Sequence, residues 1–174
     1  DGAFQLASYL LELGHRRIAI LTGPEGTSTA DDRLAGYRRA MFETRLELNE
    51  DWIFRGSFTQ DSGFEMATNA MRLMPSPTAI FAANNFIAIG AMKALQELNQ
   101  SVPEDVALVG FDDLPEALVM FPFLTVAAQP AYGMAKEATR LLLARIAGEA
   151  PAQHQEIVLP TELIIRQSTG QPLL

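Results

Sequence analysis

The chain has 174 residues, of which 48% are hydrophobic, so it is long enough to form one ordinary domain with a sizeable core. Its formal net charge is −8, and adjacent basic residues occur only at Arg16-Arg17 and Arg38-Arg39, which disfavours nucleic-acid binding by this chain itself. The absence of cysteine excludes disulfides, thiol catalysis and cysteine-based metal sites, and it fits a reducing compartment.

The first predicted element is a helix over residues 2–13. Leu6, Leu10 and Leu13 fall on one stripe, and Gly14 follows as a C-terminal stop. An opening helix is unusual, because folds of alternating strands and helices generally open with a strand.

Short apolar runs with the composition of buried strands then alternate with helical patterns. The predicted strands are residues 16–23, 51–58, 78–85 and 105–112. The predicted helices are 33–43, 61–74, 86–98, 114–121 and 131–147, the first preceded by a capping box of Thr29 and Asp32. This order predicts an α/β fold with a parallel sheet flanked by helices on both faces.

The last predicted strand lies within residues 156–168, after a long excursion through the helix at 131–147 that ends at Gly148. An element that leaves a sheet and later returns to it predicts a second lobe. We expect the other parts of that lobe to lie upstream of Asp1.

In open parallel sheets, ligands bind beyond the carboxyl ends of the strands. The polar and aromatic side chains that follow the predicted strands are Arg33, Phe58, Asn84, Asn85, Asp112, Asp113 and Gln129. Arginine and aspartate give charge-assisted hydrogen bonds, amides both donate and accept, and an aromatic ring covers an apolar face. The set therefore suits a neutral, hydroxyl-rich small molecule.

Motifs for catalysis or metal binding are weaker. The loop 22–33, "TGPEGTSTADDR", lacks the P-loop lysine and the dinucleotide-binding glycine spacing. His15 follows a helix end and is interpreted as a cap, while His154 lies in a polar loop, and neither has a nucleophile nearby in sequence. The adjacent acids Asp112 and Asp113 lack the further hard ligands that magnesium requires. We expect no catalysis, no metal and no cofactor.

A set of motifs occurs in a family-specific order along nearly the whole chain. They are "YLLELGHRRIAILTGP", "RLAGYRRA", "GSFTQDSGF", "PTAIFAANNFIAIGAMKAL", "VPEDVALVGFDDLP", "LTVAAQP" and "VLPTELIIRQST". From Asp1 to about Thr169, the chain resembles the effector-binding core of the lactose/galactose repressor (LacI/GalR) family of bacterial transcription regulators.

The resemblance implies a fold like that of type I periplasmic sugar-binding proteins, in which three crossovers join two α/β lobes around an effector cleft. Residues 1–127 and 157–174 would form the C-terminal lobe, and the helix within 130–148 would belong to the N-terminal lobe. The helix-turn-helix headpiece, the hinge helix and most of the N-terminal lobe would be absent from this chain. The opening helix and the late strand are both explained in this way.

The resemblance also assigns effector-contacting positions, and they coincide with the strand-end set. They are Arg33, Phe58, Asn84, Asp112 and Gln129. Two positions depart from the family pattern. Ser57 replaces the usual acid before the aromatic residue, and Asn85 stands where the family usually has aspartate, which removes one negative charge near the cleft.

Each of these side chains has a structural alternative. Arg33 could pair with Asp31 or Asp32 on its own helix. Phe58 could belong to the core, Asn84 could cap the following helix, and Gln129 could bond to backbone. These structural roles remain as alternatives to the ligand-binding roles.

The two adjacent acids receive different predictions. Successive strand residues point to opposite faces, so we expect Asp112 to bind the effector and Asp113 to cap the helix at 114–121. Asp112→Ala should then cost effector binding, and Asp113→Ala should mainly cost stability.

The segment 116–124, "EALVMFPFL", is too apolar for a free surface loop. It either packs on its own lobe or forms a dimer contact, as the resemblance implies for the intact protein. The dimer candidates are Leu118, Met120, Phe121 and Phe123.

We therefore expect a cytoplasmic ligand-sensing domain that binds a sugar or related metabolite and reaches operator DNA only through the missing headpiece. A periplasmic sugar-binding protein of transport is the alternative, and an enzyme using Asp112 or Asp113 is a third hypothesis. No apolar stretch is long enough to span a bilayer, and the start lacks a signal-peptide pattern, so we expect no membrane partner.

Overall fold

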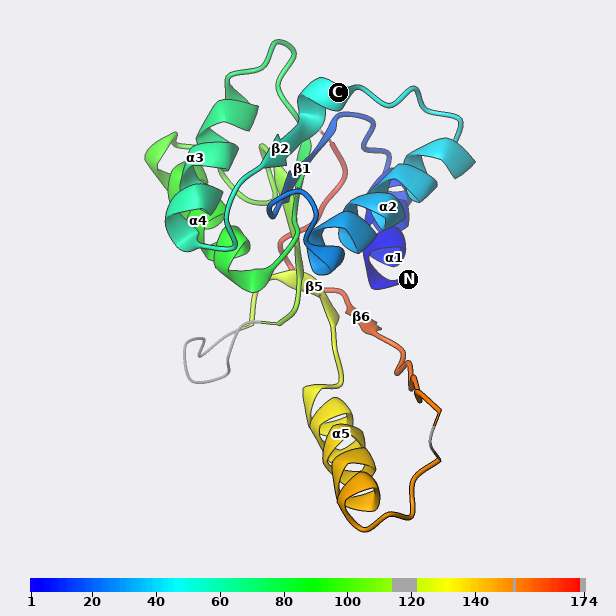
Figure 1. The fold of residues 1–174 in the computed structure, drawn as a ribbon. Helices are drawn as coiled ribbons and strands as arrows, with labels where there is room; N and C mark the ends of the chain where they lie inside the picture. Colours follow the sequence, from blue (N-terminus) through cyan, green and yellow to red (C-terminus); the bar gives the residue numbers. More distant parts are fainter. Residues whose placement is uncertain (114–121, 152, 173–174) are drawn as a thin grey trace.

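The computed structural model describes residues 1–113, 122–151 and 153–172, and within them one sheet has the strand order β2-β1-β3-β4-β5-β6 (Figure 1). The strands are β1 (Ile18–Thr22), β2 (Ile53–Arg55), β3 (Ala79–Ala82), β4 (Ala107–Phe111), β5 (Thr125–Ala128) and β6 (Glu162–Ile164). Strands β1 to β5 are parallel, whereas β6 runs antiparallel to β5. The predicted α/β fold with a largely parallel sheet is confirmed.

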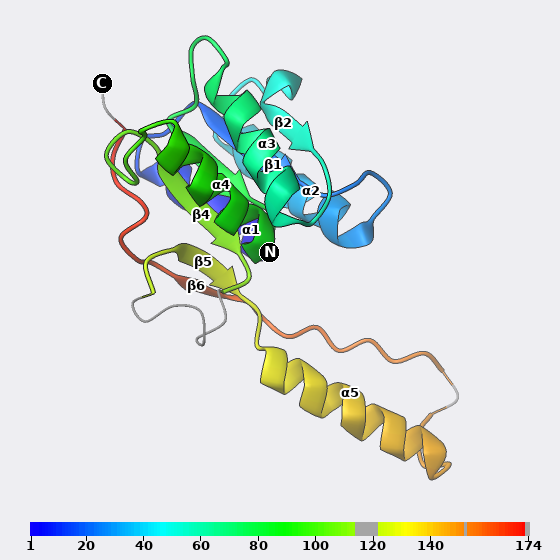
Figure 2. The same cartoon turned by 90° about the vertical axis from the view of Figure 1, so that its left-hand side faces the viewer.

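Helices cover both faces of the sheet, as predicted (Figure 1). The helices are α1 (Gly2–Glu12), α2 (Ser28–Glu43), α3 (Gln60–Met71), α4 (Asn85–Glu97) and α5 (Ala131–Ile146). Helices α1 and α2 pack on one face, and α3 and α4 pack on the other. Figure 2 shows α5 projecting from the end of β5, away from the layered body, and no residue of α5 is buried. None of the described helices is both long and apolar enough to cross a membrane.

The continuous apolar runs are explained by this covering of both faces. Every residue of β1, β3 and β4 is buried. Along β1, Ile18 and Ile20 face α1 and α2, while Ala19 and Leu21 face α3 and α4. Each apolar side chain of β1 is therefore buried in one of two cores, whereas a strand with one solvent-exposed face would bury only every second side chain.

Helices α3 and α4 cross at two glycines. A Cβ atom on Gly90 would overlap the carbonyl oxygen of Gln60, and one on Gly63 would overlap the carbonyl oxygen of Ile87. The two backbones approach so closely that no side chain larger than hydrogen fits between them.

The predicted capping box before α2 is wrong. The helix begins at Ser28 with Thr27 as its N-cap residue, so Thr29 already lies inside it. Asp31 organises the preceding turn instead, because its carboxylate accepts the N–H of Gly26 at 3.0 Å.

The predicted buried strand at 51–58 is also shorter and more exposed than expected. A 3-10 turn, η1 (Glu50–Trp52), comes first, and Asn49 caps it by accepting the N–H of Asp51 at 2.9 Å. Among the described strands, β2 lies at the edge of the sheet and pairs only with β1, so Ile53 and Phe54 are partly buried and Arg55 is exposed.

His15 caps α1 through its backbone, whose N–H donates to the carbonyl of Leu10 at 3.1 Å, but its side chain takes no part in the cap. It is buried, its Nε2 donates to the carbonyl of Gly170 at 2.9 Å, and its Nδ1 lies 2.9 Å from Oγ1 of Thr78. The side-chain cap comes from Arg16, whose Nη1 donates to the carbonyl of Leu11 at 2.9 Å.

The segment after β6 is held between β4 and β5 by buried Ser168. Its backbone N–H donates to Phe123, and its carbonyl accepts the N–H of Leu108 at 2.8 Å. Its hydroxyl donates to the carbonyl of Leu108 at 2.6 Å and accepts the N–H of Thr125 at 2.8 Å. Four hydrogen bonds thus tie this one residue into the sheet.

Candidate ligand-binding site

Three of the predicted site residues meet at the carboxyl edge of the sheet, where β4 and β5 end. Arg33, in α2, places Nη2 3.3 Å from Oδ2 of Asp112, which follows β4. Gln129, which follows β5, donates its side-chain amide to the other carboxylate oxygen of Asp112. The three side chains come from separate parts of the sequence, and the parallel strands bring them together.

The guanidinium of Arg33 is largely buried, with 11% of the side chain exposed. It also donates to the carbonyl of Ala83 and lies over the ring of Phe111, 4.0 Å from the ring centre. Burial lowers the pKa of Arg33, and the carboxylate of Asp112 opposes that shift. Asp31, an alternative partner predicted from the sequence, pairs with Arg55 at 3.5 Å instead.

Asp112 has a left-handed backbone, with φ 68. Few residues other than glycine adopt this conformation, and aspartate is among those that tolerate it. Its N–H donates to the carbonyl of Ala127 at 2.9 Å, which fixes the bend to the end of β5. This bend, rather than the pleat of a strand, separates the two adjacent acids, because β4 already ends at Phe111.

Asp113 forms a bidentate ion pair with Arg166, which follows β6. Nη1 of Arg166 is 2.8 Å from Oδ1, and Nη2 is 2.6 Å from Oδ2. The hydrogen bond that Arg166 donates to Asp113 raises the pKa of Arg166. The two acids do have different partners, as predicted, but the helix that Asp113 was expected to cap, 114–121, lies outside the described residues.

The asparagines after β3 have structural contacts. Asn84 is the N-cap of α4 and accepts the N–H of Ile87 at 2.8 Å, which confirms the alternative read from the sequence. The side-chain amide of Asn85 donates to the carbonyl of Asp113 at 3.1 Å. An effector contact at Asn84 stays a prediction.

Phe58 lies against Gly23, where a Cβ atom would overlap its ring. It is half-buried and packs on the core between the sheet and helices α3 and α4. Packing is therefore its observed role, and stacking on a ligand stays a prediction.

A hollow of about 470 Å³ lies beside the Asp112 cluster, between the sheet edge and the start of α5. It is lined by Asn85, Asp112, Asp113, Gln129, Ala131 and Met134. Its volume is in the range of small-molecule sites. Ala131 and Met134 were missed from the sequence, although their spacing of three on a helix directly after Gln129 places them on one face.

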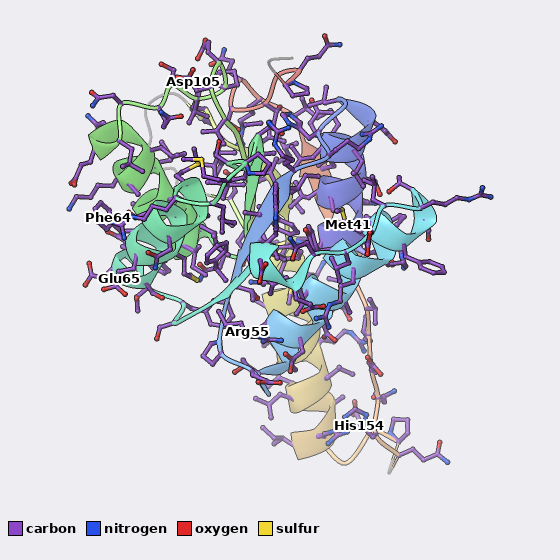
Figure 3. All side chains as sticks on the ribbon, turned by 90° about the horizontal axis from the view of Figure 1, so that it is seen from above. Met41, Arg55, Phe64, Glu65, Asp105 and His154 are labelled. Carbon is purple, nitrogen blue, oxygen red and sulfur yellow. The ribbon has the colours of Figure 1, made fainter. Side chains whose placement is uncertain are left out.

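Metal binding and a role for His154 at the site have less support in the described residues. No group of histidine and acidic side chains among them is arranged to hold a metal ion. Figure 3 shows His154 at the outer end of the α5 excursion, away from the sheet.

Of the dimer candidates, Leu118, Met120 and Phe121 lie outside the described residues. Phe123 is half-buried and borders a second hollow, of about 420 Å³, beside α4. The other residues around that hollow are Ile89, Met92, Lys93, Leu95, Gln96, Gln100 and Val102.

Comparison with known proteins gives a consistent set of relatives. Residues 7–169 match the model of the periplasmic binding protein-like domain. The HTH-type transcriptional repressor PurR of Haemophilus influenzae (strain PittEE) is 35% identical over 170 residues, which are 97% of this chain and 51% of that protein. The chain therefore spans about half the length of the curated relatives it matches.

Solved structures agree with the sequence matches. A regulatory protein of the LacI family from Chloroflexus aggregans has a TM-score of 0.87 and 39% identity, covering 97% of this chain and 60% of that one. A complex of the transcriptional regulator CelR with cellobiose has a TM-score of 0.89 and 38% identity, covering 96% of this chain and 51% of that one. These relatives are regulators rather than transport proteins or enzymes.

Proposed function

The chain belongs to the family of periplasmic binding protein-like domains, in the form found in LacI-family regulators, and we propose that it is the part of a transcription regulator that senses a small effector. The observation that carries the proposal is the cluster of Arg33, Asp112 and Gln129 beside the hollow at the carboxyl edge of the sheet. Effector binding there would bias the state of DNA-binding parts that are not in this chain.

The chemistry of the cluster favours a sugar or a related metabolite. A carboxylate and a guanidinium side by side can bind neighbouring hydroxyl groups, one donating to Asp112 and the other accepting from Arg33. Gln129 adds an amide with both a donor and an acceptor. The sugar cellobiose in the CelR complex supports this class without naming the effector of this chain.

We further propose that the chain performs no catalysis. Asp112 and Asp113, the acids that an enzyme would use, form ion pairs with Arg33 at 3.3 Å and with Arg166 at 2.6 Å. Regulation is preferred over periplasmic transport because the relatives are transcription regulators, and a cytoplasmic location is part of the same proposal.

Two lobes remain the proposed organisation, with residues 1–127 and 157–174 in one and the helix within 130–148 in the other. The exposure of α5 supports this division. Tyr132 is 85% exposed and Ile146 is 74% exposed, so an apolar surface of the helix has no cover within the described chain.

A homodimer and operator binding through a headpiece belong to the same proposal. The hollow beside Phe123 and α4 supports an interface there because most of its lining side chains are apolar. The net charge of −8 supports DNA contact through a separate domain rather than through this one.

A thermal-shift screen tests the proposal. Sugars, nucleosides and sugar phosphates, beginning with cellobiose, would be added to the purified chain and to a longer regulator that contains it. We expect at least one compound to raise the melting temperature, and Asp112→Ala to abolish that shift. Asp32→Ala removes an exposed carboxylate from the same helix as Arg33, and this control should keep the shift. Failure of every compound with both proteins would contradict the proposal.

A further inference from the structure

The turn that carries Asp112 is held from several directions. The carboxylate of Asp113 accepts hydrogen bonds from both terminal nitrogens of Arg166, at 2.8 and 2.6 Å. The carbonyl of Asp113 accepts the side-chain amide of Asn85 at 3.1 Å. On the other side, the N–H of Asp112 donates to Ala127 at 2.9 Å. The residue after the proposed ligand-binding acid is thus fixed through both its side chain and its backbone.

Arg166 is itself anchored before it reaches Asp113. Its Nη1 also donates to the carbonyl of Leu124 at 2.8 Å, and its backbone N–H donates to Oγ1 of Thr125 at 2.9 Å. Only 16% of its side chain is exposed. A bidentate pair with a partly buried and anchored arginine defines one geometry, which a flexible surface pair would not do.

The turn needs such restraint because the backbone of Asp112 is left-handed, with φ 68. This conformation is unfavourable for an L-residue, and it persists where the surroundings determine it. Relaxation to an ordinary conformation would rotate the carboxylate of Asp112 away from Arg33 and Gln129.

We propose that Arg166 and Asp113 are positioning residues, which hold the turn so that the carboxylate of Asp112 faces the ligand hollow. The ligand part of this inference rests on the proposed function, while the positioning part does not. Arg166 lies on the segment that returns from α5, so the pair also links the position of Asp112 to that returning segment.

The side-chain amide of Asn85 also helps to hold the turn at Asp112 and Asp113. Aspartate, the residue usual in the resembling family, has no donor for the carbonyl of Asp113 when ionised, and it would add a negative charge beside that acid. The asparagine therefore suits the turn in this chain, and Asn85→Asp should loosen it.

The first experiment needs no ligand. Nuclear magnetic resonance spectra of the chain would follow the backbone amide of Asp112 and the side-chain amide of Gln129 in Arg166→Gln. We expect both signals to move, because the turn relaxes and the bond from Gln129 to Asp112 is lost. Arg38→Gln is the matched control, since Arg38 also contacts both oxygens of an acid, Glu50, at 2.8 and 2.7 Å, but at an exposed place. It should leave both signals unchanged.

Conservative variants separate positioning from general stability. Arg166→Lys keeps the positive charge but cannot make the bidentate contact with Asp113. It should therefore move the amide signals of Asp112 and Gln129 in the same direction as Arg166→Gln, by a smaller amount. Should Arg166→Gln fail to fold, Asp113→Asn and Asn85→Asp test the same contacts from the other side. Unchanged Asp112 and Gln129 signals in folded variants at these positions would overturn the inference.

The second experiment titrates cellobiose, and any sugar that shifts the melting temperature, into the same variants. Arg166→Gln should weaken sugar binding at least tenfold, and Arg38→Gln should not change it. Equal sugar binding by the wild type and Arg166→Gln would overturn the inference and leave the proposed function standing. Moved signals in Arg166→Gln, together with no sugar binding by the wild type, would support positioning and count against the proposed function.

Discussion

Arg33 and Asp112 lie 79 positions apart in the sequence and form an ion pair of 3.3 Å at the carboxyl edge of the sheet. The arginine reaches the acid across the ring of Phe111, which it covers at 4.0 Å. Charge, hydrogen bonding and stacking therefore act together on one guanidinium. Substitutions that change the shape of this group, and not only its charge, should be informative.

Arg33→Lys should weaken sugar binding about tenfold or more, because lysine keeps the charge but cannot bond to Ala83 and Asp112 with one planar group. Calorimetric titration of a sugar found in the screen measures the change. Arg39→Lys is the control, since Arg39 lies over the ring of Phe4 at 3.6 Å on an exposed surface. Equal losses in the two variants would contradict a specific role for Arg33.

His15 should make the stability of the fold depend on pH. Burial lowers its pKa below the ordinary value of 6.5, so the unfolded chain binds the proton more readily than the folded chain. The stabilisation from neutral His15 is complete above about pH 6.5, and it is lost as the pH falls through the lower pKa of the folded state.

Urea unfolding between pH 7.5 and roughly pH 5 measures this dependence. In His15→Gln the free energy of unfolding should fall less over this range than in the wild type, because the titrating group is gone. His154→Gln, at an exposed position, should retain the wild-type dependence. An unchanged slope in His15→Gln would assign the pH dependence to other groups.

Gly90→Ala should destabilise the fold by about 1–3 kcal/mol or more, because the added methyl group overlaps the carbonyl of Gln60 and forces α3 and α4 apart. Thermal and urea unfolding give the value. Gly133→Ala is the control in α5, where the nearest atom is the tip of the Leu159 side chain at 3.3 Å. It should leave the unfolding of the sheet unchanged, and a similar loss there would indicate a general effect of helix substitution.

Ser168→Ala should cost about 1–3 kcal/mol for each buried backbone group left unpaired, namely the N–H of Thr125 and one acceptor site of Leu108. Ser57→Ala, at an exposed position, should change the free energy of unfolding by no more than about 0.5 kcal/mol. A neutral Ser168→Ala would mean that these groups find other partners in the folded chain.

The sequence predicted the parts of the fold that follow from repeated local patterns. The apolar runs around Ile18, Ala79 and Ala107 are confirmed as strands, because burial on both faces leaves a continuous apolar signature. The meeting of Arg33, Asp112 and Gln129 was predicted from one rule of parallel sheets, that strand ends share an edge. The family resemblance is confirmed by the comparisons.

The contacts that were missed depend on how distant segments align. Arg166 meets Asp113 because the returning segment lies beside the start of β5, and no local pattern fixes that alignment. The left-handed bend at Asp112 was missed because no glycine marks it in the sequence. The side chains of Asp112 and Asp113 do diverge as predicted, but the bend separates them, not the alternation of a strand. The backbone of His15 does bond to the nearest helix end, but its side-chain partners, Thr78 and Gly170, are far away in the sequence and were missed.

The antiparallel pairing of β5 with β6 has a further consequence. Ala128 and Glu162 are opposite each other, so these strands form a β-hairpin whose connection is the whole excursion through residues 129–161. The entropy of closing a loop grows only slowly with its length, and two-residue Asn-Gly turns connect such hairpins well. Replacing the excursion with such a turn should leave a compact sheet domain that folds without α5 and has lost one wall of its ligand site.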